Sequence, residues 1–191
     1  MDQPVMAVSG DSTFFHSVIP ALVNGVHHKS NFILVVLDNN ATSKTGFQPH
    51  PGTEVTAMGE GAQKISIEDI CRAIGARVAI CDPFDLKATT KTLLDLLEQN
   101  NGVRVCIMRR TCELVRAKNS KHPYTVKINP KKCLGEDCGC NRLCCRVFRC
   151  PALIWDPVQG KTRIDEVICS ECGVCADICP EGAITKEAAQ A

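Results

Sequence analysis

The sequence is poor in aromatic residues, nearly neutral in net charge and without a long apolar run. Aromatic residues make up 4% of its 191 residues, and the formal net charge is +1. Few rings for base stacking and no strong positive field argue against a nucleic-acid partner. Residues 1–4 do not look like a secretory signal, and no later run is long enough to cross a bilayer. We therefore expect a cytoplasmic protein with no membrane partner.

Cysteine, in contrast, is abundant and unevenly distributed. Of the 14 cysteines, ten lie between Cys133 and Cys179. A secreted disulfide scaffold can show such a density, but we find no export signal in the sequence. Metal ligation is the better explanation for the cysteine-rich segment.

The first part of the chain alternates between strand-like and helix-like segments. Continuous apolar runs predict four strands, at residues 5–8, 32–37, 77–80 and 103–108. A helix is expected between Ser66, a capping residue, and Gly75, and another over residues 86–97. The helix after the first strand has an apolar face made of Phe14, Val18, Ile19, Leu22, Val23 and Val26. This alternation predicts an α/β fold, in which a parallel sheet has helices on both faces.

The chain changes character near residue 119. Residues 118–132 are rich in lysine and proline and show no periodicity, and cysteines dominate from Cys133 onward. We predict one domain at residues 1–119 and a small α+β domain at residues 120–191.

The turn after the first predicted strand has the residues of an anion and metal site. Gly10 ends this strand, Asp11 follows, and Ser12 opens the first helix. The free N–H groups at such a helix start favour an anion above the turn. The second strand delivers Asn39 to the same edge of the sheet, where ligands of open α/β sheets collect. Asp11 and Asn39 supply oxygen atoms of the kind that Mg²⁺ prefers, so we predict a magnesium-bound diphosphate here.

This arrangement resembles the diphosphate grip of thiamine diphosphate (ThDP) enzymes. In that family a Gly-Asp-Gly-like turn is followed by Asn-Asn or an equivalent, and here Ser12 replaces the second glycine. Residues 10–17, residues 37–39 and the Thr-Gly-Phe-Gln-Pro-His-Pro-Gly string at 45–52 are similar to the α subunit of indolepyruvate ferredoxin oxidoreductase. That enzyme belongs to the 2-oxoacid:ferredoxin oxidoreductase group. The similarity extends over nearly the whole chain.

The resemblance implies a set of cofactor contacts. Magnesium is expected on the side chains of Asp11 and Asn39 and on the backbone carbonyl of Ala41. The wider ThDP site is expected to comprise Gly10, Asp11, Ser12, Asn39, Asn40 and Ala41. His16 and His50 are candidate catalytic residues, although a polar residue near a helix start is as often only structural. The long segment at residues 38–64 is expected to close over the cofactor, since structureless loops of this length are usually functional.

The last four cysteines follow the C-x2-C-x2-C-x3-C-P spacing of bacterial ferredoxins. They are Cys169, Cys172, Cys175 and Cys179. The first three thiolates of such a run hold three corners of one 4Fe–4S cube, and the fourth ligates the other cluster of two-cluster proteins. A structural zinc site is the alternative, but it needs only four thiolates and does not favour this spacing. We therefore expect the second domain to be ferredoxin-like, with two 4Fe–4S clusters.

A second, less regular group of cysteines precedes this run. Cys150 lies before Pro151, so we expect it to share a cluster with Cys169, Cys172 and Cys175. Cys179 then completes the other cluster.

Three further ligands of that other cluster come from five candidates. Cys144 takes the usual third place, which leaves Cys145 spare. Between Cys133, Cys138 and Cys140 the sequence does not decide. The basic run at residues 142–149 either attracts an acidic electron carrier or offsets the negative charge of the clusters.

A ThDP site and two clusters on one chain predict a reaction that delivers electrons from ThDP chemistry. The resemblance implies oxidative decarboxylation of a 2-oxo acid, an aryl pyruvate such as indolepyruvate. It further implies coenzyme A as acyl acceptor and ferredoxin as electron acceptor. The alternative is a non-catalytic iron–sulfur electron-transfer subunit that docks to a separate enzyme chain.

ThDP enzymes also need a domain that binds the pyrimidine ring of the cofactor. In the family that this chain resembles, such a domain precedes the region seen here, whereas this sequence begins one strand before Gly10. We expect either a β subunit or a missing N-terminal pyrimidine-binding domain to supply that half, and we favour the second.

Overall fold

The computed structural model describes residues 3–120, 124–137 and 139–188. It divides into two compact units, Met1–Val115 and Arg116–Ala191. The division falls within α5 (Glu113–Asn119), close to the predicted boundary at residue 119. Each unit is described by itself.

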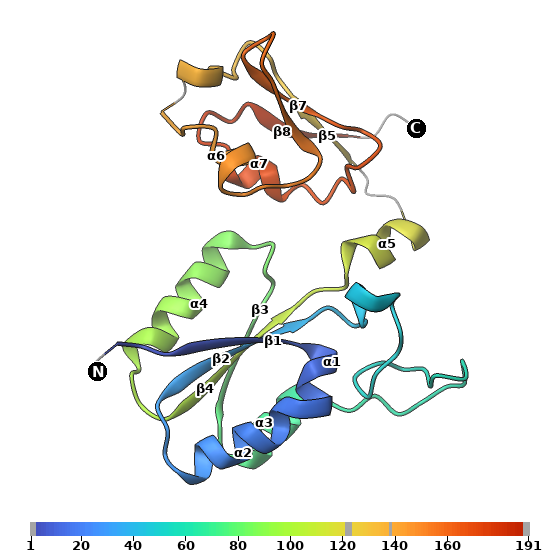
Figure 1. The fold of residues 1–191 in the computed structure, drawn as a ribbon, viewed down its shortest axis with the longest axis vertical. Coiled ribbons are helices and arrows are strands. Elements are labelled where there is room, and N and C mark those ends of the chain that lie inside the picture. The colour runs from blue at the N-terminus through green and yellow to red at the C-terminus, as the bar shows by residue number, and fades with distance from the viewer. Residues whose placement is uncertain (1–2, 121–123, 138, 189–191) are drawn as a thin grey trace. The chain divides into compact units, whose positions relative to one another are not determined.

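The first unit is built on a four-stranded parallel sheet in the order β1-β2-β4-β3 (Figure 1). Its strands are β1 (Met6–Gly10), β2 (Phe32–Asp38), β3 (Arg77–Cys81) and β4 (Val103–Arg109). They fall on the four apolar runs that predicted strands, each within a few residues of the expected bounds. Because all four strands run in parallel, their carboxyl ends meet at one edge of the sheet.

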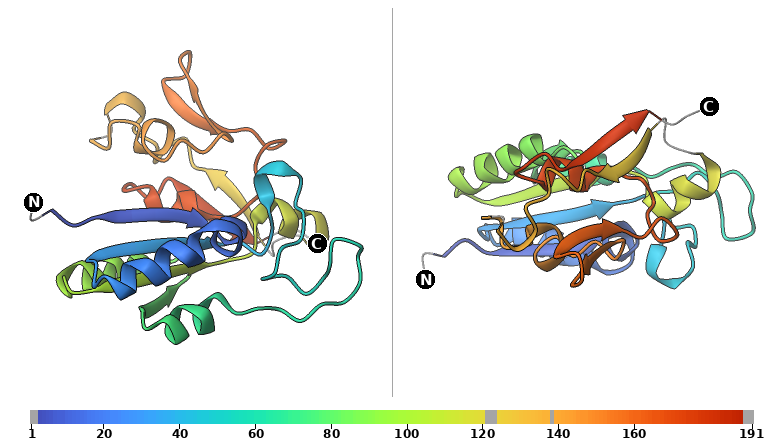
Figure 2. Two further views of the ribbon diagram at one scale, coloured as in Figure 1. Left: turned by 60° about the horizontal axis from the view of Figure 1, so that its bottom comes forward. Right: turned by 90° about the horizontal axis from the view of Figure 1, so that it is seen from above.

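Helices cover both faces of this sheet, which confirms the predicted α/β class (Figures 1 and 2). On one face, α2 (Ile19–His27) and α3 (Ile67–Ile74) pack against Leu34 and Val36 of β2. On the other face, α4 (Leu86–Glu98) packs against Ile33 and Val35 of the same strand. Successive side chains of a strand point to opposite faces, so one continuous apolar run serves both cores.

The helix that follows β1 is not one regular helix. It begins as α1 (Asp11–Thr13), widens into a π-helical turn, η1 (Phe14–Val18), and continues as α2. Pro20 has no N–H to donate and its ring crowds the preceding turn, so the wide turn lies directly before it. Val23 was expected on the buried face and is instead 47% exposed, because α2 is rotated relative to a straight helix.

The ends of α3 agree with the sequence-based expectation. The hydroxyl of Ser66 accepts a hydrogen bond from the N–H of Asp69 at 3.1 Å, which caps the first turn. Gly75 ends the helix in the left-handed conformation, with φ 95°.

The segment between β2 and α3 is more ordered than a structureless loop. It contains a short 3-10 helix, η2 (Ser43–Thr45), and two β-bridges that join Thr42 to Gln48 and Val55 to Gly61. The backbone N–H of Thr53 donates to the carbonyl of His50 at 2.8 Å. These contacts give residues 42–61 a defined path at the carboxyl edge of the sheet.

The second unit is a small α+β fold, as predicted. Its strands are β5 (Tyr124–Ile128), β6 (Leu153–Asp156), β7 (Lys161–Ile164) and β8 (Ile184–Ala188). β5 pairs antiparallel with β8, and β6 with β7. The short helical segments are η3 (Gly135–Asp137), α6 (Leu143–Arg146) and α7 (Val174–Ile178). The core contains Val126, Leu153 and Ile184, and cysteines pack around it.

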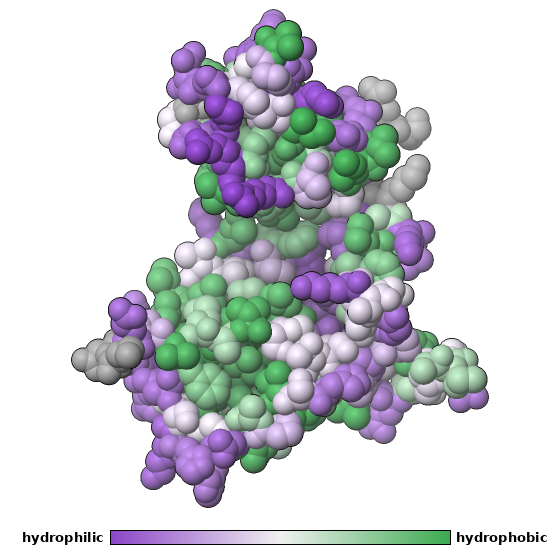
Figure 3. Space-filling model, viewed as in Figure 1, coloured by the Kyte–Doolittle hydropathy of each residue, from purple (hydrophilic) through white to green (hydrophobic). Residues whose placement is uncertain are grey.

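Apolar side chains are also exposed on the first unit. Figure 3 shows apolar surface over β1 and α2, where Met6, Val8 and Val23 are exposed. β1 lies at an edge of the sheet, so one side of its backbone is not paired with another strand of the sheet. Among the helices that the structure describes, none is both long and apolar enough to span a bilayer.

Candidate cofactor site and cysteine groups

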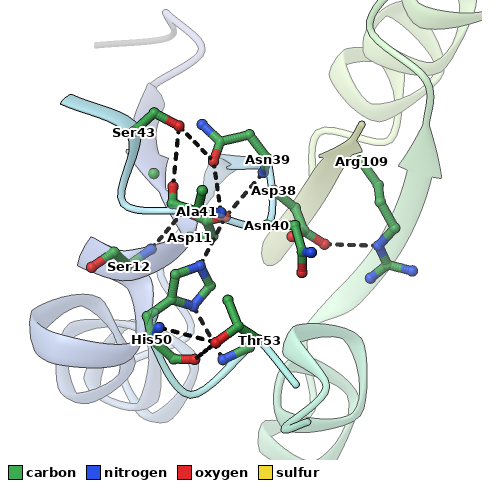
Figure 4. Close-up of polar contacts among 12 residues, drawn as sticks. Asp11, Ser12, Asp38, Asn39, Asn40, Ala41, Ser43, His50, Thr53 and Arg109 are labelled. Atoms are coloured by element: carbon green, nitrogen blue, oxygen red, sulfur yellow. Dashed lines mark hydrogen bonds and ion pairs between the residues drawn. The ribbon is translucent and has the colours of Figure 1, made fainter. Parts of the chain in front are cut away.

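Asp11 lies where the carboxyl end of β1 turns into α1 (Figure 4). The residue is 2% exposed. The N–H of Ser12 donates to Oδ1 at 2.8 Å, and the N–H of Asn39 donates to Oδ2 at 3.0 Å. Each carboxylate oxygen therefore has one backbone donor, and Oδ1 keeps a lone pair for a cation. The contact confirms the prediction that Asp11 and Asn39 meet at one sheet edge.

Asn39 turns its side-chain amide toward the loop that follows β2. Its Oδ1 accepts from the N–H of Ala41 at 3.1 Å and lies 3.3 Å from the hydroxyl of Ser43. The same hydroxyl lies 3.3 Å from the carbonyl oxygen of Ala41. Two of the three oxygen atoms expected to hold magnesium thus face one atom, Oγ of Ser43. Ser43 was missed from sequence, although its place four residues after Asn39 in a polar stretch was an available signal.

The other residues expected at this site are more exposed. A Cβ at Gly10 would meet no atom within 4 Å, so the space beside this turn is open. Asn40 is exposed, has φ 61°, and accepts a hydrogen bond from Nζ of Lys64 at 3.4 Å. His16 is exposed on η1, and its Nδ1 lies 2.6 Å from the carbonyl oxygen of Ser12. A catalytic role for His16 stays a prediction.

His50 is brought to Asp11 by the loop after η2. Its Nε2 lies 3.2 Å from Oδ2 of Asp11, and its side chain has no exposed area. The N–H of Gly52 donates to Nδ1 at 3.1 Å. The hydroxyl of Thr53 donates to the backbone carbonyl of His50 at 2.8 Å. The sequence string at 45–52 singled out this residue, but only the folded loop places it against Asp11.

An ion pair flanks the site at the ends of β2 and β4. Nε of Arg109 donates to Oδ2 of Asp38 at 2.7 Å, and Glu68 lies 4.0 Å from the same guanidinium group. Asp38 is 7% exposed, whereas the side chain of Arg109 is 43% exposed. The positive charge of Arg109 thus compensates the negative charge of the buried Asp38, the residue before Asn39. Part of the Arg109 side chain still faces solvent.

The donor atoms at this edge fit a magnesium-bound diphosphate. Mg²⁺ takes oxygen ligands and usually keeps only one or two carboxylates, with carbonyl, water and phosphate oxygens making up the rest. Asp11, Asn39 and Ala41 offer one carboxylate, one amide oxygen and one carbonyl. Nε2 of His50 is buried and has no well-aligned hydrogen-bond acceptor in the described residues, although Asp11 is next to it. The open space beside Gly10 leaves room for phosphate oxygens.

Four cysteines of the second unit lie close to one another around α7. Burial, and after it the neighbouring Cys172, Cys150 and Cys169, raises the pKa of the Cys175 thiol to about 12. Burial also raises the pKa of Cys169. These four cysteines are the set that the sequence predicted for one cluster. Cluster binding requires thiolates, so it would release protons from this group.

Four other cysteines line a single cavity in the same unit. They are Cys133, Cys140, Cys144 and Cys179. The N–H of Ala183 donates to Sγ of Cys179 at 3.3 Å. Cys138 lies outside the described residues. In the part of the chain that the structure describes, no three His, Cys, Asp or Glu side chains converge as they would around a single metal ion.

Cys145 is beside this cavity and is not among its lining residues. Its Sγ lies 4.0 Å from Sγ of Cys144, and Oγ1 of Thr162 lies 3.4 Å from each of the two sulfur atoms. Burial raises the pKa of the Cys144 thiol. That Cys144, and not Cys145, ligates a cluster stays a prediction.

Comparison with known families gives one match in the first unit and one in the second. Residues 1–108 match the thiamine pyrophosphate enzyme, C-terminal TPP binding domain. The chain belongs to this family. Residues 162–185 match the 4Fe-4S binding domain.

The chain is also similar to several curated proteins. Indolepyruvate oxidoreductase subunit IorA of Pyrococcus horikoshii is 42% identical over 187 residues, which are 95% of this chain and 28% of the relative. The subunit of the same name from Archaeoglobus fulgidus is 38% identical over 188 residues, 96% of this chain and 29% of the relative. These matches confirm the resemblance drawn from the sequence. The chain spans less than a third of the length of these relatives.

The chain is also similar to a solved structure. Benzoylformate decarboxylase from Polynucleobacter necessarius is 20% identical and has a TM-score of 0.43, over 58% of this chain and 20% of that chain.

Proposed function

We propose that this chain is part of an enzyme that oxidatively decarboxylates a 2-oxo acid and passes the electrons to ferredoxin. One observation carries the proposal, which is the presence of two kinds of site on one chain. The first is the buried carboxylate of Asp11 among other oxygen atoms, in a domain of a TPP-binding family. The second is a pair of cysteine groups, each with four members. ThDP held by these residues would supply the carbanion chemistry needed to decarboxylate a 2-oxo acid. The clusters give the released electrons a path, and a redox-free decarboxylase would not need them.

In the first unit, Asp11, Asn39 and the carbonyl of Ala41 would hold magnesium. Gly10, Ser12 and Asn40 complete the proposed cofactor contacts, with Gly10 leaving space for the diphosphate. The backbone N–H groups of Ser12 and Asn39 keep the Asp11 carboxylate in one orientation. His16, at the solvent-exposed side of the same helix start, is the candidate for moving a proton near the cofactor.

In the second unit, two sets of four cysteines would ligate two 4Fe–4S clusters. Cys150, Cys169, Cys172 and Cys175 form one set, supported by their electrostatic proximity. Cys133, Cys140, Cys144 and Cys179 form the other, supported by the cavity that they line. This choice leaves Cys145 without a cluster. Cys138, which the sequence kept open as a ligand, lies outside the described residues, so the cavity does not test it.

The substrate and partners follow from the names of the relatives and from the family resemblance. The substrate would be an aryl pyruvate such as indolepyruvate, because the curated relatives are named for it. Coenzyme A would accept the acyl group, and ferredoxin would accept electrons in the cytoplasm. A β subunit or an N-terminal pyrimidine-binding domain would complete the ThDP site.

The test is anaerobic and uses the cluster-loaded chain. ThDP, magnesium and indolepyruvate are added, and the visible iron–sulfur absorbance is followed. Bleaching in the wild-type chain, and none in Asp11→Asn, is the expected result, because Asn keeps the size of the side chain but not its charge. The measurement is repeated with the full-length subunit and its partner, since the pyrimidine-binding half is expected there.

Two outcomes separate this proposal from its rival. If the full-length wild-type protein does not bleach although dithionite reduces its clusters, ThDP-linked reduction is ruled out. If the chain shows no affinity for ThDP and Asp11→Asn keeps all activity of the complex, the chain is an electron-transfer subunit.

A further inference from the structure

His50 is a buried polar side chain whose two ring nitrogen atoms both face defined atoms. Its side chain has no exposed area, and the ring of Phe15 lies beside it with a centroid distance of 5.7 Å. Nδ1 accepts a hydrogen bond from the N–H of Gly52 at 3.1 Å. Nε2 lies 3.2 Å from Oδ2 of Asp11. No face of this ring is open to a substrate.

The contact with Gly52 decides which ring nitrogen carries the proton. A backbone N–H can only donate, so Nδ1 must be the acceptor and holds no hydrogen in this arrangement. The ring proton is then on Nε2, the atom that faces Asp11. The tautomer of a histidine is set in this way by the partner of its other nitrogen.

Position 52 favours glycine for the same contact. A Cβ there would lie 2.7 Å from the ring of Phe15 and 3.0 Å from the ring of His50. Without the Cβ, the backbone of residue 52 comes close enough for its N–H to reach Nδ1. The loop therefore holds the imidazole from one side and directs it at the carboxylate on the other.

We propose that His50 is a positioning residue that orients Asp11 for the metal ion of the cofactor, through Nε2–H and Oδ2. The inference rests on the proposed function, because it requires Asp11 to ligate magnesium. It replaces the direct catalytic role that the sequence suggested for His50. The backbone N–H groups of Ser12 and Asn39 donate to this carboxylate, and Nε2 of His50 is a side-chain nitrogen placed against it, 3.2 Å from Oδ2.

The three N–H groups are divided between the two oxygen atoms of the Asp11 carboxylate, which explains what His50 adds. Ser12 holds Oδ1, while Asn39 and His50 both lie against Oδ2, so the carboxylate cannot rotate without losing contacts at both oxygens. Partners of this kind around a metal ligand contribute to metal affinity, and their loss typically costs about 10–100-fold. His50 also ties the loop at residues 42–61 to Asp11, because its Nε2 lies against Oδ2 of that carboxylate.

The test compares two substitutions at the same position. His50→Gln places an amide N–H near the position of Nε2, whereas His50→Phe keeps a flat ring and removes the donor. Mn²⁺ is the probe, and the free-ion EPR signal reports its binding to the full chain in the presence of excess ThDP. Asp11→Asn is the reference for a lost ligand, and thermal melts report the folded fraction of each variant.

The expected result is a loss of Mn²⁺ affinity of about 10–100-fold in His50→Phe and recovery to within about threefold of wild type in His50→Gln. Equal affinity in His50→Phe and wild type, while Asp11→Asn binds no Mn²⁺, would overturn the role of His50 and leave the proposed function standing. Equal loss in both variants, matched by equal loss of folded protein, would assign His50 a purely structural role. Absence of ThDP-dependent Mn²⁺ binding in wild type would remove the proposed site itself, and this inference with it.

A second measurement needs no metal or cofactor. Long-range proton–nitrogen NMR correlations of the histidine side chains identify the tautomer of each ring, and His50→Gln assigns the signal of His50. The Nε2–H tautomer is expected. The Nδ1–H tautomer would overturn the inference, since Nε2 would then have no proton to donate to Asp11.

Discussion

The backbone N–H of Gly52 donates to Nδ1 of His50, and a Cβ at position 52 would lie 3.0 Å from the same ring. His50 and Gly52 are therefore packed so closely that a side chain larger than that of glycine at position 52 would force its neighbours to shift. This packing links the local sequence Pro-His-Pro-Gly to the carboxylate of Asp11, which lies on a different element.

We expect Gly52→Ala to destabilise the first unit by about 1–3 kcal/mol, because the added methyl group overpacks a buried site. Gly61→Ala is the matched control, since a Cβ there meets no atom within 4 Å. Urea unfolding of both variants measures the difference. Equal stability of the two would show that the loop relaxes around position 52.

The ion pair between Asp38 and Arg109 is expected to contribute measurably to stability. Asp38→Asn should lower the free energy of unfolding by about 1–2 kcal/mol, because a short charge-assisted hydrogen bond at a buried carboxylate is lost while Arg109 is partly hydrated. Arg72→Gln, which removes an exposed pair with Glu68 in one helix, should cost under about 0.5 kcal/mol. Thermal or urea unfolding tests the contrast, and similar losses in both variants would contradict it.

Two buried thiols make the first unit sensitive to alkaline pH. Burial raises the pKa of Cys71 from 9.0 to about 11, and burial followed by the neighbouring Cys81 raises that of Cys106 to about 12. Below pH 9 both thiols are protonated in the folded chain and in the unfolded chain, so they do not change the free energy of unfolding. Above it the unfolded chain loses these protons first, so stability falls as pH rises toward the folded pKa.

The expected slope is at most about 1.4 kcal/mol per pH unit for each thiol. Urea unfolding at several pH values above 9 measures it, and Cys71→Ala should show a shallower fall than wild type. Identical slopes would mean that Cys71 ionises in the folded state as readily as in the unfolded state.

Iron content distinguishes the adjacent cysteines of α6. Cys144→Ala should lose one of the two clusters, about half of the iron and sulfide, because Cys144 lines the cavity. Cys145→Ala should retain both clusters. Chemical iron and sulfide analysis with EPR of the reduced protein makes the comparison. The reverse pattern, or full iron in both variants, would contradict the proposed ligand set.

The fold of the first unit was largely predictable because its signals are local. The run at residues 32–37 is apolar without interruption, and β2 is buried against helices on both sides. Ser66 and Gly75 marked the ends of α3 through their own capping geometry. The wide turn before Pro20 was not foreseen, because helical spacing alone does not distinguish a regular turn from a π-helical one.

The candidate site was predictable only in part. Asp11 and Asn39 were recognised because each follows a strand whose end is readable from sequence. Ser43 and the contact of His50 with Asp11 were not, because they depend on the path of a loop that is held by its own hydrogen bonds.

The sequence by itself determined which elements form, which strand ends carry oxygen donors, and which cysteines follow a cluster spacing, because each of these depends on residues close together in the chain. Only the tertiary structure decided that Cys133 and Cys140 share a cavity with Cys144 and Cys179, and that His50 faces Asp11. Each of those relationships includes at least one pair of residues that are far apart in sequence. They are set by strand order, helix packing and the course of loops, which no local pattern encodes.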